Sequence, residues 1–157
     1  YSDFCNRVKN GWLFSGHYNR ITQGNQQNPL REHHLGGFNP MANYTKTNVG
    51  SAPRTELHDI LGLTGAEVSI NQLPAGAGVP FVHAHQQNEE IYGILAGKGK
   101  AVIDGEEIAL TAGDWLKVAP AAKRQFSAAA DSSITYVCIQ VKENSLGGFT
   151  ANDATVY

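Results

Sequence analysis

Between His83 and Gly97 the chain reads His83-Ala-His85-Gln-Gln-Asn-Glu-Glu90-Ile-Tyr-Gly-Ile-Leu-Ala-Gly97. The two histidines stand at positions i and i+2, so on an extended strand both imidazoles point to the same face. Glu90 opens the next hydrophobic run, and a hairpin through residues 86–89 would bring its carboxylate beside the histidine pair. Two imidazoles and one carboxylate suit a divalent transition metal such as Fe, Mn, Ni, Zn or Co. The stretch therefore predicts a metal site whose three protein ligands leave coordination positions open.

The same residues also allow a simpler interpretation, in which they are solvated residues without a metal. A His-x-His pair is common on solvated loops, and Glu89-Glu90 taken alone indicates a solvated charged turn. The regular pattern of strands around these residues favours the metal site over that interpretation.

From Thr55 onward the chain is a succession of short hydrophobic runs that end at glycine or proline. Thr55–Leu61 fits either a short helical turn or an edge strand. Asp104-Gly105 between two alternating runs predicts a tight hairpin. Short strands at close spacing without a long helix predict a β-sandwich or barrel. The expected strands are Ala66–Leu73, Val79–His85, Glu90–Leu95, Lys100–Ile103, Glu107–Leu110, Trp115–Val118, Gln125–Ala128 and Ile134–Lys142.

Composition narrows the class of protein further. The 157 residues suffice for one domain with a core, and 17 glycines with only 17% charged residues suit a turn-rich β protein. The net charge is −2 and no basic stripe is present, so we expect no nucleic-acid binding. No apolar run approaches the ~18 residues of a membrane span, and we see no signal-peptide pattern. Cys5 and Cys138 do not make a disulfide framework, and a free thiol weakly favours the cytoplasm.

Residues 1–54 differ in character from the rest and predict an N-terminal extension to a barrel over residues 55–145, with a tail over 146–157. The extension is rich in Asn, Gln, Gly and His and lacks sustained periodicity. Met41 is the only methionine of the chain, so one hypothesis is that residues 1–40 are a translated leader or a cloning remnant.

The opening stretch resembles the first motif of the cupin superfamily, G-x5-H-x-H-x(3–4)-E-x6-G. The resemblance covers about residues 60–142 and implies a small single-domain cupin, an all-β protein whose fold is a double-stranded β-helix, or jelly-roll barrel. Ala77 holds the position of the leading glycine. The residues that fall on the pattern are His83, His85, Glu90 and Gly97.

The second cupin motif, G-x5-P-x-G-x2-H-x3-N, is matched less well. Gly113 and Pro120 fit it with one extra residue between them. Ala122 then takes the place of the glycine, Ala129 that of the asparagine, and Gln125 that of the histidine that is the fourth ligand. The resemblance thus implies the metal-site residues His83, His85, Glu90 and Gln125.

Gln125 leaves three alternatives open. Its amide oxygen can bind the metal as a neutral and weaker donor than imidazole. Without it, the two histidines and Glu90 form the facial arrangement associated with non-haem iron oxygenases. In the third alternative, Gln125 forms a hydrogen bond with the substrate or with a metal-bound water. An amide cannot act as a general base in any of these cases.

Two residues are weaker catalytic candidates. Tyr92 shares a strand face with Glu90 and could donate a hydrogen bond inside the barrel, or it could be an ordinary core aromatic. Gln72 has the parity of Val68 and Ile70, which we take as the inward face, so it either supports the site or lies at the surface.

Three charged residues carry less weight. We expect Arg124 to face away from the site and Lys123 to share the parity of Gln125, both as solvated charges. Trp115 and Lys117 share a strand face, which we interpret as structural.

The resemblance favours a metal-dependent enzyme that acts on a small oxygen-rich or carboxylate-bearing molecule, with dioxygenase-like chemistry ahead of isomerase or lyase chemistry. The alternative is a non-catalytic cupin that binds a metal or small ligand, because this fold does not dictate one function. Cupins of this size often pair, so we expect a homodimer in which residues 42–65 contribute to the interface.

Overall fold

The structure is a computed structural model that describes residues 43–147 and 153–157. Cys5 and the leader hypothesised over residues 1–40 lie outside the described residues. The described tail residues, 146–147 and 153–157, are exposed and belong to no helix or strand. The elements are β1 (Arg54–Glu56), α2 (His58–Leu61), β2 (Glu67–Leu73), β3 (Asn88–Ile103), β4 (Glu106–Thr111), β5 (Trp115–Val118), β6 (Arg124–Ala128) and β7 (Ile134–Lys142).

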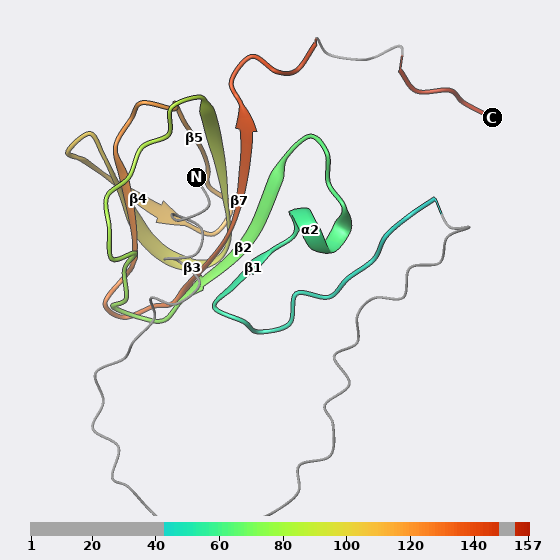
Figure 1. Ribbon diagram of the computed structural model, residues 1–157. Helices are drawn as coiled ribbons and strands as arrows, with labels where there is room; N and C mark the ends of the chain where they lie inside the picture. The colour runs from blue at the N-terminus through green and yellow to red at the C-terminus, as the bar shows by residue number, and fades with distance from the viewer. Residues whose placement is uncertain (1–42, 148–152) are drawn as a thin grey trace, which may run out of the picture. The chain divides into compact units, whose positions relative to one another are not determined.

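Strand β3 organises the sheet, because it pairs antiparallel with four other strands. Its first part, up to Gly97, pairs with β5 and β7, and the rest pairs with β4 from Lys98 and with β6 from Gly99. A register shift between Ile94 and Ala96 lies within the pairing with β7. Beyond β7 the sheet continues through β2 to β1, and Figure 1 shows the strands curling into a barrel with β1 and α2 beside β2. The expected jelly-roll barrel is confirmed.

The hairpin expected at Asp104-Gly105 joins β3 to β4. Ile103 faces Glu106 across a two-residue turn, and Asp104 and Gly105 have φ angles of 50° and 90°. Positive φ at both central positions is the property that makes Asp-Gly a favoured hairpin turn. The pattern of turn residues therefore located this connection correctly.

Aromatic side chains fill the part of the barrel interior next to Glu90. Tyr92 stacks on Phe126 with ring centroids 4.1 Å apart, and Phe126 stacks on Tyr136 at 5.5 Å. Ile94 and Ile134 extend the same buried cluster. Glu90 and Tyr92 alternate with outward residues on β3, so the inward face of this strand carries both the candidate ligand and the core.

On β2 the inward face is the opposite of the one expected from sequence. Ser69, Asn71 and Leu73 are buried, whereas Val68, Ile70 and Gln72 alternate with them on the outer face. The prediction took the apolar residues as inward, but this part of the interior is lined by polar groups that bond to one another. Asn71, for example, donates to Ser69 Oγ and accepts from Arg54. Gln72 therefore does not support the site.

The segment expected as a strand over Val79–His85 is not one. Its backbone pairs with β6 in isolated bridges alone, at His83 with Arg124 and, just before the segment, at Gly78 with Ser127. Pro80 lacks the N–H group that a continuous ladder needs at every second position. The hairpin expected through residues 86–89 is also wrong, because β3 pairs with β5 and β7 rather than with this segment.

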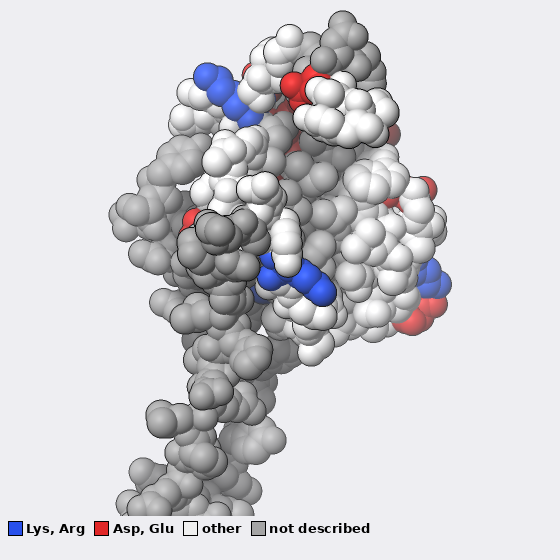
Figure 2. All heavy atoms as spheres, turned by 90° about the vertical axis from the view of Figure 1, so that its right-hand side faces the viewer, with Lys and Arg blue, Asp and Glu red and all other residues white. Residues whose placement is uncertain are grey.

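Several charged side chains on the described surface form pairs of opposite sign. Lys98 lies 2.8 Å from Asp131, Lys100 2.6 Å from Glu107, and Lys117 2.8 Å from Glu89. On the face shown in Figure 2 the charged side chains are sparse, and the basic ones form no stripe among the described residues. No helix in the described ranges has the length and apolar character to cross a membrane.

Candidate metal centre

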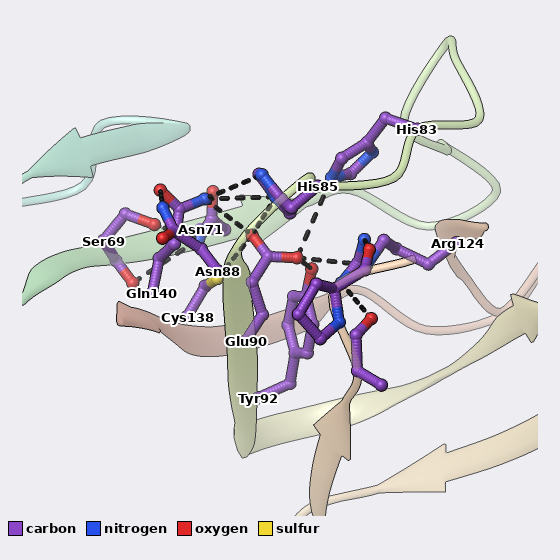
Figure 3. A network of polar contacts seen from close by, with 12 residues as sticks. Ser69, Asn71, His83, His85, Asn88, Glu90, Tyr92, Arg124, Cys138 and Gln140 are labelled. Atoms are coloured by element: carbon purple, nitrogen blue, oxygen red, sulfur yellow. Dashed lines mark hydrogen bonds and ion pairs between the residues drawn. The ribbon is translucent and has the colours of Figure 1, made fainter. Parts of the chain in front are cut away.

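His83, His85 and Glu90 converge at one place in the barrel. Each offers one ligand atom, and these atoms all lie within 4.8 Å of one another. The Nε2 atom of His85 is 3.1 Å from Glu90 Oε1, and Nε2 of His83 is 3.8 Å from Glu90 Oε2. Figure 3 shows both imidazoles directed at the carboxylate from the segment that precedes β3.

Backbone hydrogen bonds hold the histidine segment although it forms no strand. His83 exchanges two backbone bonds with Arg124, and the N–H of His85 donates to the carbonyl of Pro120. The segment is thus extended enough for residues i and i+2 to share a side, as expected. The two imidazole rings meet edge to face with centroids 5.3 Å apart.

The two oxygens of Glu90 have different surroundings. Oε2 accepts a 2.5 Å hydrogen bond from the Tyr92 hydroxyl and lies 3.2 Å from Arg124 Nε. Oε1 faces His85 and the Gln140 amide, whose nitrogen donates to it at 3.3 Å. Tyr92 and Arg124 therefore fix the carboxylate through Oε2, which also faces His83, and Oε1 is left directed at His85 and Gln140.

Glu90 is only 5% exposed, yet it is ionised. Burial by itself raises the pKa of the carboxyl group, but the neighbouring imidazoles of His83 and His85 and the hydrogen bond from Tyr92 outweigh burial and hold its pKa well below the usual range. A carboxylate that carries its charge at neutral pH is the form that binds a metal ion.

The neighbouring acidic groups keep their protons. Burial, and then the neighbouring Cys138 and Glu90, raise the pKa of Tyr92 well above its ordinary value. Burial and the charge of Glu90 likewise raise the pKa of the Cys138 thiol, whose sulfur is 3.6 Å from Glu90 Oε1. At neutral pH both groups are therefore hydrogen-bond donors to Glu90 rather than bases or nucleophiles.

Arg124 points into the barrel, so the prediction that it faces away as a solvated charge is wrong. Its side chain is fully buried, and its guanidinium donates to the carbonyls of Ala119 and Pro120. The Nε atom makes no aligned hydrogen bond, so its 3.2 Å contact with Glu90 is an ion pair. The cost of burying the guanidinium is offset by this charge and by the two carbonyls.

The spacing of the second cupin motif shows where the error arose. With five residues between them, the glycine position at Gly113 places the proline position of the motif on Ala119, not on Pro120. The second glycine position then falls on Ala121 and the histidine position on Arg124. Aligning the motif's proline with Pro120 requires one extra residue after Gly113 and moves the expected fourth ligand from position 124 to Gln125. The extra residue was the signal that the alignment had slipped, because one residue reverses the face of a strand.

Gln125 accordingly lies on the other face of β6. Arg124, Phe126 and Ala128 are the buried residues of this strand, and Gln125 alternates with them. Its amide nitrogen donates to the carbonyl of Val79 at 2.8 Å. The structure thus brings His83, His85 and Glu90 together but directs Gln125 away from the face that carries Arg124.

Gln140 is a site residue that sequence reasoning missed. It lies on β7 directly opposite Glu90 in the sheet, and its amide nitrogen is 3.1 Å from His85 Nε2. Its amide oxygen accepts a bond from Asn88 at 3.2 Å. The alternation Ile134, Tyr136, Cys138 along the predicted strand could have indicated that Gln140 also faces inward.

The residues fit a divalent transition metal. The donor set of two imidazoles and one ionised carboxylate is one that such metals prefer. Among the described residues, His83 Nδ1 is buried and has no hydrogen-bond partner, so the protein itself does not satisfy this polar nitrogen. His83, His85 and Glu90 are the residues that would hold the ion.

Fold and site together define a class, the small jelly-roll proteins with a candidate metal centre inside the barrel. The family model described as "Cupin domain" matches residues 70–140. A cupin protein of Bacteroides fragilis with a solved structure is 66% identical, with a TM-score of 0.71, over 74% of this chain and 99% of that one. The chain belongs to the cupin family.

More distant structures share the barrel alone. A cupin 2 conserved barrel domain protein of Salinispora arenicola is 20% identical over 57% of this chain and 75% of that chain, with a TM-score of 0.52. A sugar phosphate isomerase of the cupin superfamily from Silicibacter pomeroyi is 23% identical over 57% and 60%, also at 0.52. No curated protein gives a significant match to this sequence.

Proposed function

We propose that this cupin is a metal-dependent enzyme that acts on a small oxygen-rich or carboxylate-bearing molecule, with dioxygenase-type chemistry favoured over isomerase or lyase chemistry. The observation that carries the proposal is the convergence of His83, His85 and Glu90, with ligand atoms within 4.8 Å of one another. Two histidines and one carboxylate with open positions are the donor set of non-haem iron oxygenases. When bound, the ion would supply a Lewis acid that binds and polarises an oxygen-bearing molecule.

The chain's own residues prepare the site for that chemistry. Tyr92 and Arg124 hold Glu90 through Oε2, so the carboxylate keeps its charge and orientation. The backbone bonds of His83 to Arg124 fix the first histidine against the same strand. Such fixed donors cost little reorganisation when a ligand arrives.

A second candidate is a cupin that binds a metal or a small ligand without catalysis. The observation that favours it is the Arg124 guanidinium, which lies 3.2 Å from Glu90 at the position that the second cupin motif gives to a fourth ligand. Burial raises the pKa of Tyr92 and of Cys138, so neither of these neighbours of Glu90 is the base that an isomerase would need.

Oxygen uptake separates these functions. Protein loaded with Fe(II) is mixed with a panel of catechols, diketones and thiols while dissolved oxygen is recorded. The proposal predicts uptake with at least one class of compound and none with His85→Ala. Metal-loaded protein that binds a compound of the panel but consumes no oxygen supports the non-catalytic binder and contradicts the oxygenase.

A further inference from the structure

A fourth polar group lies beside His85 and Glu90, the side-chain amide of Gln140. Its terminal nitrogen is 3.1 Å from His85 Nε2 and 3.3 Å from Glu90 Oε1, and those two atoms are themselves 3.1 Å apart. Three polar atoms from β3, β7 and the histidine segment thus form a nearly equilateral triangle, and Figure 3 shows the three side chains meeting there.

This triangle has the dimensions of one face of a metal coordination sphere. With metal–ligand bonds of about 2.0–2.1 Å, neighbouring ligand atoms lie about 3.0 Å apart in an octahedral site and about 3.3 Å apart in a tetrahedral site. The three observed distances fall between 3.1 and 3.3 Å.

A half-turn of the amide places an oxygen donor at this corner. The oxygen and nitrogen of a glutamine amide are nearly equal in size, so exchanging them leaves the triangle unchanged. The amide oxygen now accepts a hydrogen bond from Asn88. The same half-turn of Asn88 would present its own oxygen to the Gln140 nitrogen, so both amides keep a partner after the exchange.

The second cupin motif supplies the reason for a replacement ligand. Arg124 occupies the position that the motif gives to the fourth ligand, and a guanidinium cannot donate a lone pair to a metal. We propose that Gln140 is the fourth protein ligand of this site and binds a divalent transition metal through its amide oxygen. The inference rests on the proposed metal-dependent function and adds a ligand to it.

The test is a titration of the full chain with Co(II), monitored by visible absorption, with unfolding followed in the presence of a chelator to confirm that each variant folds. We expect Gln140→Ala to weaken Co(II) binding by about 10-fold or more. We also expect it to change the absorption spectrum, because a ligand is lost. Gln140→Glu keeps an oxygen at this corner and is expected to bind at least as tightly as the wild type.

Gln125→Ala is the matched comparison, since it removes the same side chain from the other face of β6. We expect it to bind Co(II) as the wild type does. Gln140 acting only as a nitrogen donor to Glu90 predicts weaker binding by both Gln140 variants with an unchanged spectrum, which overturns the proposal. Equal binding by Gln140→Ala and wild type overturns it as well. A wild type that binds no Co(II) instead overturns the proposed function itself.

Discussion

Glu90 is the residue on which the polar contacts of the barrel interior converge. Tyr92 and Arg124 contact one oxygen, and His85, Gln140 and Cys138 contact the other. The ionisation of Glu90 is thus maintained by contacts and not by solvent. A positive guanidinium 3.2 Å from the carboxylate also competes with any cation for it, since Coulomb interactions are strong away from water.

Replacing Arg124 by histidine tests this competition. Arg124→His removes the competing charge and supplies an imidazole at the position that the cupin motif gives to a ligand. We expect metal affinity to rise by at least about 10-fold, or about 1.4 kcal/mol. Without metal, the variant should be less stable than wild type by about 2–3 kcal/mol, because the carbonyls of Ala119 and Pro120 lose their donor and Glu90 loses its ion-pair partner. Competition titration and chemical denaturation measure the two effects.

Lys123→His is the control for that substitution. It also exchanges a cation for an imidazole, one position away, on an exposed residue whose backbone N–H donates to the Asp104 carboxylate. Its metal affinity should equal that of the wild type. Unchanged or weaker metal binding by Arg124→His would contradict the competition between Arg124 and the metal.

At the scale of residues, three of the side chains that converge on the site were predictable from the sequence. The fourth ligand position of the motif was predicted at Gln125, whereas it falls on Arg124. His83, His85 and Glu90 could be predicted because their spacing follows the alternation of a strand and the first cupin motif. Arg124 could not, because a single residue inserted before Pro120 exchanged the two faces of β6. Gln140 was missed because its approach to Glu90 depends on β3 and β7 being neighbours, which local spacing does not contain.

At the scale of elements, the bend of β3 allows one strand to serve both halves of the barrel. Gly97 lies just after the register shift with φ of +76°, and a Cβ there would come within 1.8 Å of the Ser133 carbonyl oxygen. The first cupin motif ends on this glycine, and the structure gives the physical reason. The backbone at Ser133, just before β7, leaves no room for a side chain at position 97.

Gly97→Ala is therefore expected to destabilise the protein far more than a glycine substitution that costs backbone strain alone. Gly105→Ala is the matched control, because Gly105 also has a positive φ, +90°, and a Cβ there meets nothing within 4 Å. We expect about 1–2 kcal/mol for Gly105→Ala and at least about 3 kcal/mol for Gly97→Ala. Urea denaturation measures both, and equal losses would contradict the role assigned to Ser133.

Most elements were predictable because each is a local pattern. The ranges Trp115–Val118 and Ile134–Lys142 agree with β5 and β7, and Thr55–Leu61 contains both alternatives, a strand and then a short helix. Glu90–Leu95 and Lys100–Ile103 proved to be one strand, because the glycines between them permit a bend without ending the pairing. Val79–His85 failed since its partners are only isolated bridges.

At the scale of the whole molecule, β1 forms one end of the strand order and has a strand neighbour on one side only among the described residues. Leu57 donates to Val68, and Gln72 donates to Pro53. By the alternation of antiparallel bonds, the N–H of Glu56 then points away from β2. We propose that a second copy of the chain pairs at this edge, within the residues 42–65 expected to form the dimer interface.

A proline at position 56 removes the outward N–H without removing a bond to β2. We expect the wild type to sediment as a dimer, Glu56→Pro to shift toward monomer, and Glu56→Ala, which retains the N–H, to remain dimeric. Sedimentation velocity over a range of concentrations measures the distribution. A monomeric wild type, or a Glu56→Pro variant that is fully dimeric, would contradict pairing at β1.

The central claim is that His83, His85 and Glu90 hold a divalent transition metal. Its most direct test is elemental analysis of the full chain purified without a metal-affinity step, for wild type, His85→Ala and His58→Ala, the last an exposed histidine that contacts Asp59. The account predicts about one equivalent of metal per chain in wild type and His58→Ala, and a small fraction of that in His85→Ala. Wild type without stoichiometric metal, or a His85→Ala variant with undiminished metal, would contradict it.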